Sequence, residues 1–156
     1  MKVRDIMSAP PQICRAETDL ATASRHMKQT ATGMLVAFDG HGKIAGVVTD
    51  RDLALAIGTS RRDVRDRRVS DVMTGHVRSC HEQDNVHEAL ATMARAHVRR
   101  LPVLSADGDL KGVLSVDDII LWAVQGGGVT STELVGALRR ICLPRPVEED
   151  AAMPRM

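Results

Sequence analysis

Apolar side chains recur every three or four residues between residues 19 and 30 of the chain. This spacing places them on one face of a helix. Asp19 stands directly before the first of them, in the position where an aspartate accepts hydrogen bonds from a helix N-terminus. We therefore expect a helix from residue 19 to about residue 30, preceded by a short turn over residues 3–7 and a brief strand near residues 12–14.

Two apolar runs after this helix predict a β-hairpin. Residues 34–38 and 44–48 flank Asp39-Gly40-His41-Gly42, a sequence that tolerates the positive φ angles of a tight turn. A second helix is expected to start at Thr49 or Asp50. The first part of the chain is thus predicted to run strand, helix, strand, strand, helix.

The whole pattern returns in the second half of the chain without a gap in the alignment. Val3-Arg4-Asp5-Ile6-Met7-Ser8 aligns with Val69-Ser70-Asp71-Val72-Met73-Thr74, and Gly46-Val47-Val48-Thr49 aligns with Gly112-Val113-Leu114-Ser115. Such a duplication predicts two copies of one structural unit, and a unit of about 55 residues buries little core alone. We therefore expect an α/β (α+β) chain of two tandem βαββα repeats. They are predicted to pack sheet to sheet around one shared core, with pseudo-twofold symmetry.

The duplication also sets the expected domain limits. The first repeat is predicted to span residues 1–58, and the second is predicted to span residues 69–125. Residues 59–68 form a basic linker between them. Its arginines are more typical of a solvated loop than of a phosphate or RNA site.

Residues 126–156 follow the second repeat and are expected to form a helix and a flexible tail. Apolar residues at helical spacing predict an amphipathic helix over residues 131–142, with Ser131 as its cap. Pro144 and Pro146 are expected to end it, and the last ten residues are expected to be disordered.

Composition narrows the classes of function. The chain has one Phe, one Trp and no Tyr, so it lacks aromatic platforms for stacking single-stranded nucleic acid. Its net charge of +1 generates no field that attracts DNA or an anionic membrane. With no 18-residue apolar run and no signal-peptide pattern, we expect a cytoplasmic protein without a membrane contact.

The usual signatures of catalytic and metal sites are absent from the sequence. It holds no P-loop and no H-E-x-x-H motif, so we expect no enzyme activity and no required cofactor. Its three cysteines, Cys14, Cys80 and Cys142, form no C-x-x-C pair. We therefore predict reduced thiols in the core and no metal site.

Two strand-to-helix junctions carry the candidate chemistry. Thr49 and Asp52 in the first repeat, and Ser115 and Asp118 in the second, place a hydroxyl and a carboxylate three positions apart. This spacing is typical of a capping box that satisfies helix N–H groups, and from spacing alone capping is the favoured interpretation. The same geometry suits a nucleotide, because a helix N-terminus attracts phosphate and a carboxylate accepts hydrogen bonds from a ribose diol.

The duplicated unit, both junctions and the sequence Val98-Arg99-Arg100-Leu101-Pro102-Val103 resemble the CBS-domain family over residues 1 to about 125. The resemblance implies a pair of repeats that binds AMP, ADP, ATP, S-adenosylmethionine or a related ligand in clefts between the repeats. It also implies a homodimer formed through helices. The first repeat departs from the family pattern at Val36, where the family usually has Pro.

The resemblance assigns roles to particular residues. Asp52 and Asp118 are expected to hold ribose, and Thr49 and Ser115 to hold phosphate. The opening segments are expected to cross over, so that Ser8 to Gln12 serve the Ser115 site and Thr74 to Arg78 serve the Thr49 site. The residues expected between the two clefts are Thr32, Gly33, Arg99 and Arg100.

The two predicted clefts differ in charge. Arg51 of the first junction is replaced by Asp117 in the second, and an extra carboxylate repels phosphate. We therefore expect the Thr49 and Asp52 site to be preferred by a phosphorylated ligand.

Three functional hypotheses remain open on the sequence alone. The first is a regulatory module that senses an adenosine-type nucleotide and signals to an unknown protein partner. The second is an oligomerising or adaptor module without a physiological ligand. The third and weakest is nucleic-acid binding through the linker arginines and Arg99-Arg100.

Overall fold

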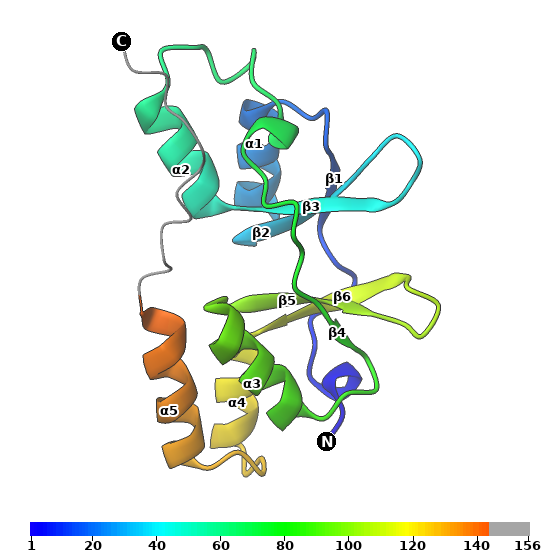
Figure 1. Cartoon of the computed structure of the whole chain (residues 1–156), viewed down its shortest axis with the longest axis vertical. Helices are drawn as coiled ribbons and strands as arrows, with labels where there is room; N and C mark the ends of the chain where they lie inside the picture. The colour runs from blue at the N-terminus through cyan, green and yellow to red at the C-terminus, as the bar shows by residue number, and fades with distance from the viewer. Residues whose placement is uncertain (144–156) are drawn as a thin grey trace.

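The computed structural model describes residues 1–143 and consists of two halves, each a three-stranded sheet with helices on its outer side (Figure 1). The elements of the first sequence repeat are the 3₁₀ turn η1 (Val3–Asp5), β1 (Ile13–Arg15), α1 (Leu20–Thr30), β2 (Met34–Phe38), β3 (Ile44–Thr49) and α2 (Asp50–Thr59). The second contains η2 (Val69–Asp71), β4 (Cys80–His81), α3 (Val86–Ala96), β5 (Arg100–Leu104), β6 (Leu110–Ser115) and α4 (Val116–Val124), and the additional helix α5 (Ser131–Cys142) follows it. The predicted pair of βαββα repeats is confirmed.

The two sheets share one topology and one register. Their strand orders are β1-β2-β3 and β4-β5-β6, with the first pair of each sheet parallel and the second antiparallel. Met34 pairs with Thr49 in the first sheet, and Arg100 pairs with Ser115 at the equivalent position of the second. The duplication seen in the sequence is therefore repeated strand by strand.

The helix boundaries follow from local hydrogen bonds. The Thr22 N–H donates to Asp19 Oδ1 over 2.9 Å, so Asp19 caps α1 as predicted. The cap of α5 is Thr130 rather than the predicted Ser131, because the Glu133 N–H donates to Thr130 Oγ1 over 3.2 Å. The predictions for Pro144, Pro146 and the tail lie outside the described residues.

The expectation of one shared core is wrong, because each half has a hydrophobic core of its own. Each sheet packs against the helices of its own repeat, and the opening segments are exchanged between the halves. Val3, near the start of the chain, is fully buried in the core of the second half. Val69, its counterpart, is fully buried in the core of the first half.

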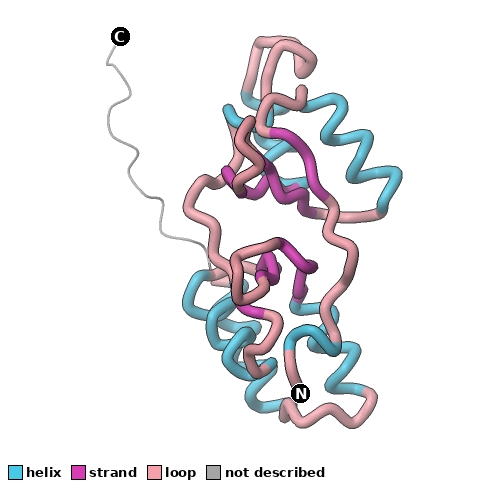
Figure 2. The backbone as a smooth tube through the Cα atoms, turned by 90° about the vertical axis from the view of Figure 1, so that its right-hand side faces the viewer, coloured by secondary structure: helices cyan, strands magenta, loops and turns pink. Residues whose placement is uncertain are grey.

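Backbone hydrogen bonds hold each exchanged segment in place. The Val3 N–H donates to the Asp84 carbonyl over 3.0 Å, and the Val69 N–H donates to the Thr18 carbonyl over 2.8 Å. Further along, Ser8 and Val113 exchange two N–H···O bonds of 2.9 and 3.0 Å. Thr74 and Val47 do the same in the first half. Figure 2 shows the two loop segments that run between the halves.

These crossings require glycine in the neighbouring strand. A Cβ atom on Gly112 would lie 2.7 Å from the Ser8 carbonyl oxygen and 2.8 Å from Met7 Sδ. Gly46 has the same relation to Thr74 and Met73, with both distances 2.8 Å. Real Cβ atoms do not approach backbone oxygen so closely, so any side chain at either position displaces the exchanged segment.

Helix α5 has no counterpart in the first repeat and packs against α3. Val129 and Ile141 are buried in the second core, with Leu134, Ala137 and Leu138 packed against it. Residues at equivalent positions of α1 and α3 explain why α5 packs on the second half. Leu90 and Ala94 of α3 are buried, whereas α1 has Ser24 and Lys28 at the same positions.

Among the described residues, no helix has the length and apolar composition to cross a membrane.

The close approach at Gly112 makes a stability prediction. Gly112→Ala should lower the free energy of unfolding by about 1–3 kcal/mol, because the added methyl overpacks a site bounded by backbone. Gly136→Ala is the matched control, since Gly136 lies inside α5 and a Cβ atom added to it would meet no heavy atom within 4 Å. It should raise stability by about 0.5–1 kcal/mol through helix propensity. Urea unfolding measures both, and a fully stable Gly112→Ala protein would contradict the exchange.

Candidate functional site

The first strand-to-helix junction, between β3 and α2, is a closed capping box. The backbone N–H and hydroxyl of Thr49 donate to Asp52 Oδ2 over 2.8 and 2.7 Å. The Asp52 N–H donates back to Thr49 Oγ1 over 3.3 Å. The capping interpretation is therefore confirmed at this junction. Both side chains are half-buried, and every described hydrogen bond of the Asp52 carboxylate uses a single oxygen.

The second junction, between β6 and α4, repeats this geometry and adds a contact. Ser115 donates from its N–H and hydroxyl to Asp118 Oδ2 over 2.7 and 2.6 Å. The Ser8 hydroxyl, on the exchanged segment, donates to the other oxygen, Asp118 Oδ1, over 3.3 Å. The structure thus brings Ser8 to Asp118, as the expected crossover requires. In the first half, Thr74 lies beside Val47 in the equivalent position.

Gln12, further along the same crossing segment, contacts residues of the first half. Its side-chain Oε1 lies 3.1 Å from His26 Nε2 on α1, and its carbonyl accepts the Val36 N–H over 3.1 Å. Pro102, at the position equivalent to Val36, has no N–H, so the second sheet cannot hold the Arg78 carbonyl by the same bond. Arg78, the counterpart of Gln12, is exposed. The two crossing segments are therefore anchored differently.

Residues from both repeats meet at Gly33. A Cβ atom there would lie 3.0 Å from Arg100 Nη2 and 3.1 Å from Asp50 Oδ2. Arg100 begins β5 of the second repeat, and Asp50 is the first residue of α2 in the first repeat. Sequence reasoning missed Asp50, because its closeness to Arg100 depends on how the two halves face each other.

The remaining candidates are more dispersed. Arg99 lies toward α5, where its Nη2 donates to Cys142 Sγ over 3.7 Å. The Thr32 hydroxyl donates to the Met34 carbonyl over 3.2 Å. Arg51, on the first turn of α2, is exposed. The structure thus groups Thr49, Arg51 and Asp52 on one helix end, and places Arg99 apart from Arg100.

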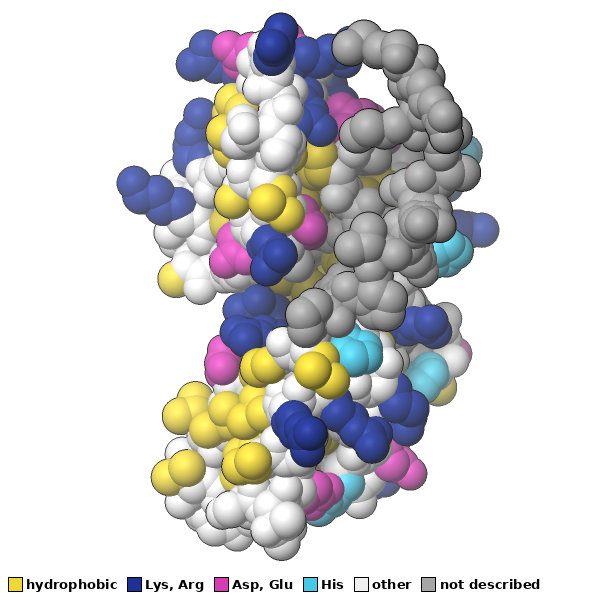
Figure 3. Space-filling model, turned by 60° about the vertical axis from the view of Figure 1, so that its left-hand side comes forward, with side chains coloured by type: hydrophobic (Ala, Val, Ile, Leu, Met, Phe, Trp, Pro, Cys, Tyr) yellow, Lys and Arg dark blue, Asp and Glu magenta, His cyan; other side chains and the backbone are white. Residues whose placement is uncertain are grey.

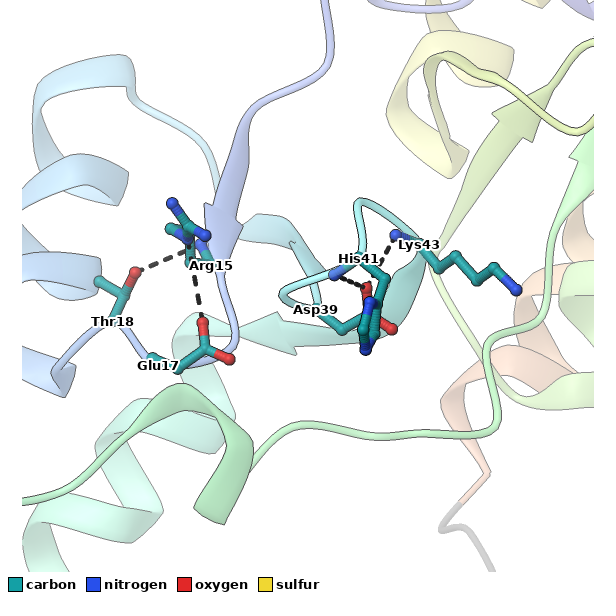
Figure 4. Close-up of polar contacts among 6 residues, drawn as sticks. All are labelled: Arg15, Glu17, Thr18, Asp39, His41 and Lys43. Carbon is teal, nitrogen blue, oxygen red and sulfur yellow. Dashed lines mark hydrogen bonds and ion pairs between the residues drawn. The ribbon is translucent and has the colours of Figure 1, made fainter.

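Polar contacts at the hairpin end of the first repeat serve the fold. The backbone N–H groups of Lys43 and His41 donate to Asp39 Oδ1 over 2.9 and 2.8 Å, and these bonds lower the pKa of the Asp39 carboxyl (Figure 4). In the same view, the Arg15 N–H donates to Thr18 Oγ1 over 3.2 Å. These contacts fix the β2–β3 turn and the turn after β1.

A surface hollow at the end of α2 was not anticipated from the sequence. Its lining residues are Thr59, Ser60, Arg62, Arg67 and Asp71. Arg67 Nη1 donates to the Ala56 carbonyl over 2.8 Å. This linker arginine therefore satisfies a carbonyl at the C-terminus of α2, where a cation is favoured by the helix dipole.

The cysteines differ from the expected set of core thiols. Cys80 is buried and Cys14 half-buried, but Cys142 is exposed at the end of α5. Burial raises the pKa of Cys14 to about 11, and burial together with the nearby Asp84 carboxylate raises that of Cys80 to about 12. All three are free thiols, and residues 1–143 contain no cluster of three or more His, Cys, Asp or Glu side chains suited to a metal ion.

The fold defines a class of small tandem-repeat modules. Two βαββα repeats exchange their opening segments, and a carboxylate takes part in the helix cap at each strand-to-helix junction. A family model of the CBS domain matches residues 3–59 and again residues 69–124. The chain therefore belongs to the CBS domain family, as the sequence resemblance implied.

Relatives of similar size support this assignment. The Bacillus subtilis protein YlbB is 32% identical over 121 residues, which are 77% of this chain and 80% of YlbB. A Burkholderia ambifaria protein with CBS domains has a TM-score of 0.73 at 28% identity, over 84% of this chain and 99% of its own. The structure of CBSX2 in complex with AMP has a TM-score of 0.66 at 25% identity, over 80% and 96% of the two chains.

The environments of the thiols predict their reactivity. Cys142 should react rapidly with Ellman's reagent at mildly alkaline pH, because it is exposed. Cys14 and Cys80 should react far more slowly, since the reactive thiolate is scarce at a pH well below a pKa of about 11 or 12. Cys142→Ser should remove the fast phase and leave the slow reaction unchanged. A fast phase that persists in this variant would contradict the assignment.

Proposed function

We propose that this chain is a non-catalytic regulatory module of the cytoplasm that binds an adenosine-type nucleotide at the Thr49 and Asp52 junction and signals to a protein partner. The observation that carries the proposal is the Asp52 carboxylate, half-buried at a helix N-terminus, with only one oxygen engaged in the cap. The AMP complex of the relative CBSX2 supports an adenine nucleotide as the ligand.

The helix cap and a ribose can use different oxygens of the Asp52 carboxylate. Thr49 occupies Oδ2, so Oδ1 remains to accept hydrogen bonds from ribose hydroxyls. The N-terminus of α2 supplies N–H groups and the positive end of its dipole to a phosphate. Arg51 on this helix and Arg100, which reaches Gly33 from the other repeat, supply positive charge. Capping and ligand binding are therefore compatible roles.

The second junction is less suited to a phosphorylated ligand. Asp117 stands where the first junction has Arg51, and the Ser8 hydroxyl already bonds Asp118 Oδ1. A nucleotide there has to displace that bond and lacks the positive charge of Arg51, while each helix has two carboxylates in its first turn, Asp50 and Asp52 in α2 and Asp117 and Asp118 in α4. We therefore propose that AMP, ADP or ATP prefers the first junction, and that S-adenosylmethionine, which has no phosphate, is less sensitive to the difference.

The Asp52 assignment is tested by unfolding with and without AMP. Wild-type protein should gain about 2.7 kcal/mol at an AMP concentration of about 100 times the dissociation constant. Asp52→Ala should lose about 1 kcal/mol without ligand, because the cap is removed. It should also lose between about half and five-sixths of the AMP increment, because AMP binding weakens on the order of tenfold to a hundredfold.

Asp19→Ala is the matched control for capping alone. Asp19 caps α1 at another helix start and lies outside the candidate site. This variant should lose similar stability without ligand and keep the full AMP increment. Asp118→Ala should reduce the AMP increment less than Asp52→Ala. An AMP increment that survives in Asp52→Ala would contradict the proposed site, and a larger effect at Asp118 would assign AMP to the second junction.

The module is expected to turn over no nucleotide. The described junctions offer carboxylates and hydroxyls already engaged in helix caps, with no arrangement of nucleophile and general base around them. Purified protein incubated with ATP should therefore release no phosphate above the buffer control. Hydrolysis that tracks with Asp52→Ala or Asp118→Ala would overturn this expectation.

We also propose that the chain forms a homodimer through its helices. The alternative function, an adaptor module without a physiological ligand, depends on such self-association. Apolar side chains remain exposed on both α2 and α4, with Leu55 at 53% and Leu121 at 63% exposure. Figure 3 shows hydrophobic side chains at the surface of both halves of the molecule. Burial of such side chains against a second copy stabilises the assembly.

A further inference from the structure

A groove lies at the edge of the first sheet, between strand β1 and helix α1. Its volume is about 360 Å³, which falls within the roughly 300–1,000 Å³ of small-molecule sites. Six of its lining residues come from these two elements: Ile13, Cys14, Arg15, Thr22, Ala23 and His26. None of the lining residues belongs to either strand-to-helix junction, so this β1–α1 groove is separate from the proposed nucleotide sites.

The β1–α1 groove is mainly apolar, because its polar side chains already have partners. The Thr22 hydroxyl donates to Asp19 Oδ2 over 2.8 Å, and His26 Nε2 lies 3.1 Å from Gln12 Oε1. What these side chains add to the groove is therefore chiefly carbon. Ile13, on an edge strand of the sheet, is 49% exposed, so covering it with an apolar group is favourable.

Charge in the β1–α1 groove comes from Arg15, and no lining residue is an aspartate or glutamate. Arg15 Nε lies 4.0 Å from Glu17 Oε2, and the two side chains are 76% and 64% exposed (Figure 4). An exposed ion pair of this length contributes little stability. The guanidinium can therefore bind another carboxylate, and its paired N–H donors match the two oxygens of that group.

The second repeat does not preserve this chemistry. Three lining residues are replaced by polar or acidic ones: Ile13 corresponds to Ser79, Thr18 to Asp84 and Thr22 to Glu88. Cys80 is buried, whereas its counterpart Cys14 is half-buried at the groove. The duplicated fold alone therefore does not account for an apolar, positively charged groove in the first half.

We propose that the β1–α1 groove binds a small apolar carboxylic acid, such as an aryl-alkanoate or a short fatty acid. The hydrocarbon part covers Ile13 and Phe38, and the carboxylate pairs with Arg15 at the rim. This ligand is of a different chemical class from the nucleotide and occupies a different place. The proposal therefore adds a second site and does not depend on the function proposed for the junctions.

The site is tested by NMR titration of the full ¹⁵N-labelled chain with 4-phenylbutyrate and with its uncharged analogue 4-phenylbutanamide. Saturable shifts of the amide signals are expected at Ile13, Thr22 and Phe38. The acid should bind on the order of tenfold more tightly than the amide, because only the acid pairs with Arg15. Equal affinities, or the absence of saturable shifts at these residues, would overturn the proposal.

Two variants test the charge requirement. Arg15→Gln should weaken 4-phenylbutyrate binding on the order of tenfold and leave the amide unchanged. Thr22→Glu introduces the residue of the second repeat, where Glu88 forms a capping box with Asn85, so the variant should fold. It should weaken the acid by a similar factor, because a carboxylate then lines the groove.

Ser24→Glu is the matched control for Thr22→Glu. It adds the same charge to α1, at a position that does not line the groove. This variant should bind the acid as the wild type does. Weakening by Ser24→Glu equal to that by Thr22→Glu would show that net charge and not the groove decides the affinity, and would overturn the proposal.

Cys14 provides a second, independent measurement, because it lines the groove and Cys80 does not. In a Cys142→Ser background, 4-phenylbutyrate at about ten times its dissociation constant should slow alkylation of Cys14 about tenfold. Alkylation of Cys80 should not change. Cys14 alkylation that is unaffected by the acid would contradict the site, whatever the outcome of the AMP experiments at Asp52.

Discussion

The structure depends on one reciprocal packing contact, in which each repeat inserts its opening valine into the core of the other. Val3 and Val69 are both fully buried, and each is held by backbone hydrogen bonds to the opposite half. The contact works only because Gly46 and Gly112 allow the crossing backbone to pass directly over the third strand of each sheet. The same crossing brings Ser8 to Asp118, so the geometry of the candidate site is a consequence of the exchange.

On this symmetric frame the two repeats have diverged in the outer surfaces of their helices and in the way their crossing segments are held. Ser24 and Lys28 keep the outer side of α1 polar, whereas Leu90 and Ala94 allow α5 to dock on α3. Val36 supplies an N–H that Pro102 cannot, so Gln12 is anchored where Arg78 is not.

The predicted limits of α1, of β1, of the β2–β3 hairpin and of α5 agree with the structure within a residue or two, because each pattern of the repeat occurs twice in the sequence. The sequence also predicted both junction pairs, and its resemblance to the CBS-domain family implied the crossover of Ser8. It failed to predict two separate cores, because apolar periodicity shows which face is buried and not which half buries it. The cap of α5 was misplaced by one position, since Thr130 and Ser131 are both good caps. The meeting of Arg100 and Asp50 at Gly33 depends on tertiary packing alone.

The exchange of opening segments also constrains the order in which the chain folds during synthesis. The first half cannot complete its core until Val69, well beyond the end of α2, has left the ribosome. Val3, made first, stays unpaired until the second sheet forms from β4, β5 and β6. The contact of Val3 with the second half therefore joins residues that lie far apart in the sequence, and such contacts form late. Neither repeat can complete its core before the other has been synthesised, so the pair of repeats is the folding unit.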